Sequence, residues 1–173
     1  MTVWLTADTH FGHGGALGLF RRPFASVAEM DEAMVERWNE RVSPADDVWH
    51  LGDFAVLSAS AAREGRADEL LARLNGTKRL IAGNNDDGTR ALDGWAESLD
   101  YAETVLDGVP VVLCHYALRV WRGQHKGAWN LHGHSHGRLK PLTRQRDVGV
   151  DAWDFAPATF DTLRSRGASR PAT

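Results

Sequence analysis

The stretch that decides the fold is VWLTADTH, residues 3–10, where an apolar run predicts a buried strand and leads directly into Asp8-Thr9-His10. The same arrangement recurs along the chain, where strand-like runs end at Gly52-Asp53, Gly83-Asn84-Asn85-Asp86, Cys114-His115 and Gly133-His134-Ser135-His136. Each motif alone is weak evidence, because Asp-x-His occurs often by chance. Five in series, each after a strand, indicate polar side chains gathered at the carboxyl edge of one sheet system.

Helical patterns separate the first of these strands. Ser26 and Glu29 form a Ser-x-x-Glu capping box ahead of a run with helical spacing, which predicts a helix to about Arg41. Asp107-Gly108 predicts a two-residue hairpin turn between two further strands. The other expected elements are helices over about 58–74 (capped by Gly76), 87–96 and 159–166, and strands over 47–51, 78–82, 129–132 and 147–150.

The order of these elements predicts an α/β domain. Strands and helices alternate in the first half of the chain and strands dominate the second, so we expect parallel strands that lead into an antiparallel set. A chain of 173 residues fits one domain with one sizeable core. We therefore expect a single domain over residues 1–166 and a frayed C-terminal tail over 167–173.

The composition indicates the expected cellular compartment of the protein and which classes of partner it is not expected to bind. The single cysteine, Cys114, excludes an internal disulfide framework, no apolar stretch reaches membrane-spanning length, and the N-terminus lacks a basic leader. We expect a cytoplasmic protein that does not interact with membranes. The formal net charge of −3 argues against a protein that coats nucleic acid by charge, and extended nucleic-acid binding is not expected. No feature of the sequence fixes the oligomeric state.

The order of the five motifs resembles the calcineurin-like metallophosphoesterase superfamily over roughly positions 3–151. The stretches DTHFGH (8–13), WHLGDF (49–54) and DVGVDA (147–152) look like its small, single-domain bacterial and phage members. The resemblance implies a four-layer α-β-β-α sandwich of two mixed sheets with helices outside. It implies one metal bound by Asp8, His10 and His136, a second bound by Asn84, His115 and His134, and Asp53 bridging both. Spacing alone does not say which histidine serves which metal.

The chemistry of these side chains favours two divalent cations. Imidazoles and carboxylates without thiolate suit Mn, Fe, Co, Ni or Zn, and Mn²⁺ is our first expectation. A bridging carboxylate holds two cations close together and leaves positions for phosphate and water.

The sequence departs from the family at Asn85. The usual Gly-Asn-His-Asp motif reads Gly83-Asn84-Asn85-Asp86 here, and the family's histidine contacts the phosphate and protonates the leaving oxygen. Asn85 can donate a hydrogen bond to phosphate but cannot deliver a proton. Either another group such as His13 or His125 supplies the proton, or the substrate has a good leaving group, or turnover is poor.

Several further residues have two interpretations. His13 is either a phosphate contact or a loop residue, and Asp151 either orients a metal-binding imidazole or forms a turn. We interpret His50 and His132 as hydrogen-bonded structural residues and Trp121 as a packing residue. Solvated surface charge is favoured over substrate contact for Arg21, Arg22, Arg119 and Lys126.

The leading hypothesis is a dinuclear metal-dependent phosphoesterase that hydrolyses a small phosphodiester or nucleotide by attack of a metal-bridging hydroxide. A phosphodiesterase is favoured over a phosphomonoesterase because Asn85 cannot act as the general acid that protonates the leaving oxygen. The alternative is a catalytically weak metal-binding scaffold that binds a protein partner. Nuclease action on polymeric DNA or RNA is not expected, since the sequence shows no accessory domain and no basic stripe.

Overall fold

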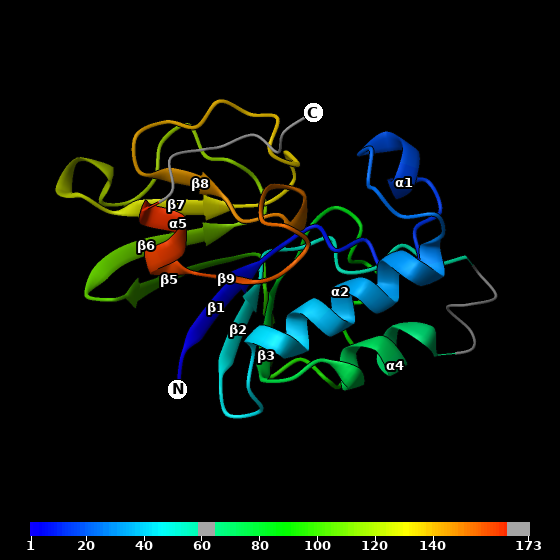
Figure 1. Cartoon of the computed structure of the whole chain (residues 1–173). Coiled ribbons are helices and arrows are strands. Elements are labelled where there is room, and N and C mark those ends of the chain that lie inside the picture. Colours follow the sequence, from blue (N-terminus) through cyan, green and yellow to red (C-terminus); the bar gives the residue numbers. More distant parts are fainter. Residues whose placement is uncertain (59–64, 166–173) are drawn as a thin grey trace.

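The chain folds into two sheets that pack face to face, as the computed structural model of residues 1–58 and 65–165 shows (Figure 1). The first sheet has the strand order β4-β3-β2-β1-β9. Its strands are β1 (Val3–Thr6), β2 (Asp47–His50), β3 (Thr77–Ile81), β4 (Glu97–Leu99) and β9 (Ala158–Thr159). β1 to β4 pair in parallel, and β9 runs antiparallel to β1.

The second sheet has the order β5-β6-β7-β8 and is also mixed. Its strands are β5 (Tyr101–Leu106), β6 (Val109–Cys114), β7 (Trp129–His132) and β8 (Gln145–Asp147). The hairpin expected at Asp107-Gly108 is confirmed between β5 and β6. The expectation of an antiparallel set is otherwise wrong, because β6, β7 and β8 pair in parallel through segments 115–128 and 133–144, which are long enough for crossover connections. The predicted class, α/β with two mixed sheets, is confirmed.

Three clusters of buried side chains define the layers. Helices α2 (Val27–Arg41) and α4 (Arg66–Arg73) cover the outer face of the first sheet, with Trp38 and Leu70 packed near Val48. Leu5 and Leu113 belong to the cluster between the two sheets. The outer face of the second sheet is covered by segment 115–128, which includes the 3-10 helix η1 (Gln124–Lys126), through the packing of Val112, Trp121 and Ala128.

Helix α2 is capped by Ser26 as its sequence predicts, but the second bond of the capping box goes to the preceding residue, Ala25, and not to Ser26. The backbone N–H of Glu29 donates to the Ser26 hydroxyl, and the Glu29 carboxylate accepts from the N–H of Ala25. The predicted end at Arg41 is confirmed. The helix expected over 58–74 is described only from Arg66, after the left-handed Gly65; residues 59–64 lie outside the described part of the chain.

Two predicted elements are wrong. The expected helix over 87–96 is a series of turns before β4, since Gly88 and Gly94 have poor helix propensity. The expected strand over 147–150 ends at Asp147, because the Asp147 carboxylate accepts the N–H of Gly149 and the 3-10 helix η2 (Val150–Ala152) follows. A short helix, α1 (Ala16–Leu19), was not predicted.

The C-terminal helix is confirmed as α5 (Phe160–Ser165), and the tail predicted over 167–173 lies outside the described residues. Among the helices of residues 1–58 and 65–165, none has the length and apolar character that a membrane crossing requires.

Candidate metal centre

The five motifs meet at one place, where strands of both sheets end. Backbone hydrogen bonds join their loops: Asp8 N donates to Gly52 O at 2.8 Å, and His10 N donates to Asp53 O at 3.0 Å. Gly133 N donates to His115 O at 3.0 Å, which fixes the loop after β7 against the end of β6. The side chains predicted from distant parts of the sequence therefore share one site.

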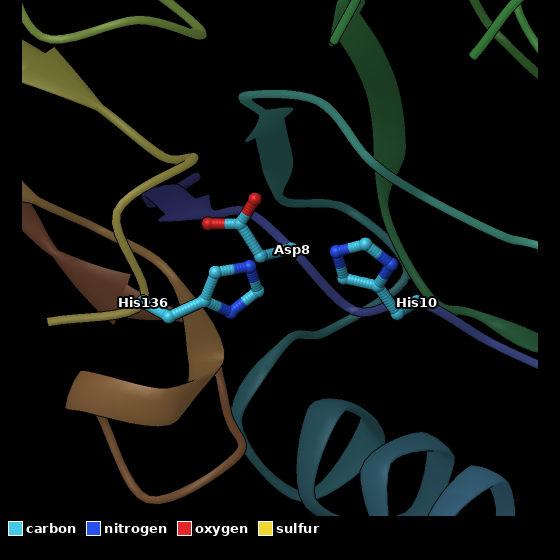
Figure 2. Close-up of side chains that lie close together, drawn as sticks. All are labelled: Asp8, His10 and His136. Atoms are coloured by element: carbon cyan, nitrogen blue, oxygen red, sulfur yellow. The ribbon is translucent and has the colours of Figure 1, made fainter. Parts of the chain in front are cut away.

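Asp8, His10 and His136 form the first group, and each offers a ligand atom within 4.8 Å of the others. Figure 2 shows the three side chains close together, from the loops after β1 and β7. Asp8 and His10 are buried, and the Asp8 carboxylate accepts the N–H of His134 at 2.9 and 3.0 Å. This set of one carboxylate and two imidazoles can hold one divalent cation.

Asp53, His115 and His134 form the second group by the same criterion. His115 donates from Nδ1 to Leu51 O at 2.7 Å, which leaves its Nε2 lone pair free, and Asn84 Oδ1 lies 3.3 Å from that Nε2. Asn84 is thus placed beside the second group.

Asp53 lies between the two groups. Its Oδ2 is 3.5 Å from His10 Nε2, and its Oδ1 is 3.7 Å from His115 Nε2. One oxygen therefore faces each group, which is the arrangement that a bridging carboxylate requires.

Three observations indicate that these residues suit divalent cations. His10 Nε2 is buried and has no hydrogen-bond partner among the described residues, and a buried nitrogen without a partner is costly. Burial, with help from His136 and Arg22, lowers the pKa of His10 to about 2, so its ring is neutral and able to ligate. Burial and the nearby charge of Asp147 raise the pKa of Asp8 well above 3.8. A cation would supply His10 with a partner and favour the Asp8 carboxylate.

Glycines before the candidate ligands leave room for the carboxylates. A Cβ added to Gly133 would lie 2.8 Å from Asp8 Oδ2, and one added to Gly83 would collide with Asp53 Oδ1. The glycines at positions 83 and 133 therefore have a steric reason, because a side chain at either one would meet a candidate ligand carboxylate.

Asp86 holds two of the loops together. Its Oδ2 accepts the N–H groups of Asp53 and Gly83, both at 2.7 Å, and its Oδ1 accepts the N–H of Phe54 and the hydroxyl of Thr89. This buried carboxylate fixes the backbone that carries the candidate bridging residue.

Asn85 and His13 both contact candidate ligands. The backbone N–H of Asn85 donates to Asp53 Oδ1 at 2.9 Å, and its Nδ2 donates to Asp53 Oδ2 at 2.7 Å. His13 Nδ1 lies 3.2 Å from His10 Nδ1. Burial, together with Arg22, lowers the pKa of His13. The catalytic roles suggested for Asn85 and His13 stay predictions. His125 is an exposed residue of η1.

The structure also places the residues with two interpretations. Asp151 accepts from His136 Nδ1 at 2.7 Å, so it contacts a candidate ligand. The pKa of Asp151 is lowered because hydrogen bonds from His136 and Arg22 outweigh the opposing effect of burial. Arg22 is buried and bonded to Asp151, so its interpretation as solvated surface charge is wrong; the sequence could not pair two residues 129 positions apart.

The structure also shows whether the remaining residues with two interpretations are buried or exposed. His50 and His132 are buried and hydrogen-bonded to Thr9 and to Gly133 O, and Trp121 packs in the outer cluster, as predicted. Arg21, Arg119 and Lys126 are exposed.

Comparison with known proteins gives a consistent picture. A family model of the calcineurin-like phosphoesterase superfamily domain matches residues 1–150. The uncharacterized protein MJ1445 of Methanocaldococcus jannaschii is 30% identical over 168 residues, covering 93% of this chain and 88% of its own length. The Gene 66 protein of Mycobacterium phage D29 is 34% identical over 188 aligned residues, covering 90% and 91%.

A solved structure supports the fold. The crystal structure of AQ665 from Aquifex aeolicus, a protein of unknown function, aligns with a TM-score of 0.74 at 20% identity and covers 94% of this chain and 97% of its own.

Proposed function

Because the chain belongs to the calcineurin-like phosphoesterase superfamily, we propose that it is a dinuclear metal-dependent phosphoesterase that hydrolyses a small phosphodiester or nucleotide by attack of hydroxide on phosphorus. The observation that carries this proposal is the position of Asp53, with one carboxylate oxygen facing each group of candidate ligands. Asp8, His10 and His136 would hold one cation, and Asn84, His115 and His134 the other.

The two cations, when bound, lower the pKa of water enough to supply hydroxide at neutral pH and offset charge on the phosphoryl group. The chain's own residues position the reacting groups. Asp53 would hold the two groups of candidate ligands at a fixed separation. The side-chain amide of Asn85 lies beside Asp53 and can turn to donate a hydrogen bond to a phosphoryl oxygen. We expect Mn²⁺ as the working metal, with Fe, Co, Ni or Zn as alternatives.

We propose that diesters with good leaving groups are preferred. The side-chain amide of Asn85 cannot act as a general acid, and loss of such an acid typically costs about 10²–10⁴ in rate. Strained cyclic or aryl phosphodiesters need less protonation of the leaving oxygen than alkyl phosphomonoesters. The cytoplasm stays the expected compartment.

The proposal is tested with purified protein and added Mn²⁺, on a bis(aryl) phosphate, a 2′,3′-cyclic nucleotide and an alkyl monoester. We expect about two metal ions per chain and turnover that falls in that order. Efficient hydrolysis of the alkyl monoester would overturn the diester preference. Metal binding without turnover of any substrate would favour the catalytically weak scaffold, for which Asn85 is the supporting feature.

A further inference from the structure

Arg22 is a buried side chain with several hydrogen bonds beside the first group. Its side chain is 0% exposed. Nε and Nη2 donate to the two oxygens of Asp151 at 2.9 and 2.8 Å, and Nη1 and Nη2 donate to the carbonyls of Thr9 and Asp8 at 2.7 and 2.6 Å. Nη1 also lies 3.5 Å from the sulfur of Met30. A guanidinium has five N–H donors, and each has an acceptor here.

The bonds to carbonyls act on the turn that carries two candidate ligands. Asp8 and His10 have φ angles of 56° and 50°, in the left-handed region that side chains rarely adopt. The carbonyls of Asp8 and Thr9 belong to the two peptide groups between these residues. Charge-assisted bonds to both oxygens fix those peptide planes and hence the directions of the two side chains.

The bonds to Asp151 act on the third ligand. Asp151 Oδ2 is shared between Arg22 Nη2 and His136 Nδ1, at 2.8 and 2.7 Å. Donation from Nδ1 to a carboxylate fixes the ring orientation and leaves Nε2 as the free donor of an electron pair. Arg22 thereby acts on all three members of the first group: on Asp8 through its own carbonyl, on His10 through the carbonyl of the preceding residue, Thr9, and on His136 through Asp151.

The second group lacks this connection. Within the described residues, none of the hydrogen bonds of Arg22 goes to Asp53, His115 or His134. A direct effect of Arg22 must therefore fall on the first group. The second group is reached through intermediate bonds, from the His10 N–H to the Asp53 carbonyl and from the His134 N–H to the Asp8 carboxylate.

We propose that Arg22 is a positioning residue that holds Asp8, His10 and His136 in their ligating arrangement and so sets the metal affinity of this group alone. The inference rests on the proposed dinuclear centre and deepens it. Residues that orient metal ligands typically change metal affinity about 10–100-fold when they are replaced.

The matched control is Arg37. Its guanidinium lies over the ring of Phe155 at 5.7 Å, as that of Arg22 does at 5.9 Å, and it bonds to the carboxylate and carbonyl of Asp154. Within residues 1–58 and 65–165, neither of these hydrogen bonds of Arg37 goes to a candidate ligand. Arg37→Met thus removes a partly exposed arginine that lies over the same ring as Arg22.

The experiment is calorimetric titration of the metal-free proteins with Mn²⁺. The wild type and Arg37→Met are expected to bind two ions alike, whereas Arg22→Met weakens one of the two sites by about 10–100-fold and leaves the other unchanged. Absence of metal binding by the wild type would refute the proposed function itself. Two sites of wild-type affinity in folded Arg22→Met would overturn this inference alone.

Further variants separate positioning from folding. Arg22→Lys keeps the charge but lacks the planar fork, so we expect it to fold and still to lose affinity at one site. Asp151→Asn should weaken that same site. In Arg22→Ala, millimolar guanidinium should restore the visible absorption spectrum of the Co²⁺-loaded protein, which a general loss of stability would not allow. Wild-type affinity in Arg22→Lys, or no effect of guanidinium, would overturn the proposal.

Discussion

Replacement of Asp86 by asparagine tests how the loops after β2 and β3 are held at the metal centre. The buried carboxylate accepts four hydrogen bonds, two at each oxygen, from Asp53, Gly83, Phe54 and Thr89. Asparagine has the same shape but only one carbonyl oxygen. Its amide group must therefore face two of the four former donors.

The expected loss follows from those bonds. Hydrogen bonds to charged groups contribute about 1.5–3 kcal/mol each, so losing two costs about 3–6 kcal/mol. Globular domains have unfolding free energies of about 5–15 kcal/mol. For a chain of this size 1 kcal/mol corresponds to roughly 2–4 °C, and we expect the melting temperature to fall by about 6–24 °C.

The assay is thermal unfolding in EDTA, monitored by circular dichroism. The control is the exposed neighbouring residue, Asp87. Asp87→Asn makes the same chemical change one residue away and should leave the melting temperature within about 2 °C, because surface substitutions stay within about 0.5 kcal/mol. A melting temperature of Asp86→Asn equal to that of the control would refute the role given to this carboxylate.

Three other changes have defined outcomes. Asn85→His should raise kcat toward diesters with alkyl leaving groups by up to about 10²–10⁴; no gain with unchanged metal content places the proton donor elsewhere. Burial, acting against the nearby carboxylate of Asp86, lowers the pKa of His50 to about 4, so the unfolded chain binds more protons than the native one between pH 6.5 and 4, and stability falls as the pH drops through that window. His50→Gln should flatten this part of the curve of melting temperature against pH in EDTA, and an unchanged slope contradicts the assignment. Excess Mn²⁺ should stabilise the wild type by about 2.7 kcal/mol at a hundredfold excess over Kd; a thermal shift of equal size in Asp53→Asn would exclude Asp53 as a shared ligand.

The sequence predicted the elements whose patterns are local. Apolar runs located β1, β2, β3 and β7, and the Ser26–Glu29 capping box located the start of α2, because these patterns depend on neighbouring residues. The helix predicted over 87–96 does not form, because the two glycines within it have poor helix propensity.

The motifs also predicted which side chains would share a site, but not what supports them. The contact between Arg22 and Asp151 spans 129 positions, and the contact between Asp86 and Asp53 joins two separate loops. No local pattern encodes such pairs. The sequence alone does not distinguish a buried arginine from a surface arginine, because burial of an arginine depends on a carboxylate that the fold places beside it.

The backbone at the site explains why these supports are needed. Among the candidate ligands, Asp8, His10, Asp53, His134 and His136 all have φ angles between 48° and 65°, where a side chain costs of order 1–3 kcal/mol. Glycine would avoid that cost but offers no ligand. Strained residues persist only where their surroundings hold them, and here the Asp8 carbonyl accepts from Arg22, the Asp53 N–H donates to Asp86, and the His134 N–H donates to Asp8. Each of these partners is buried, so the strain is maintained by groups that water cannot replace. A chain selected for stability alone would have no reason to keep five such residues together, which is an argument for function that needs no comparison with relatives.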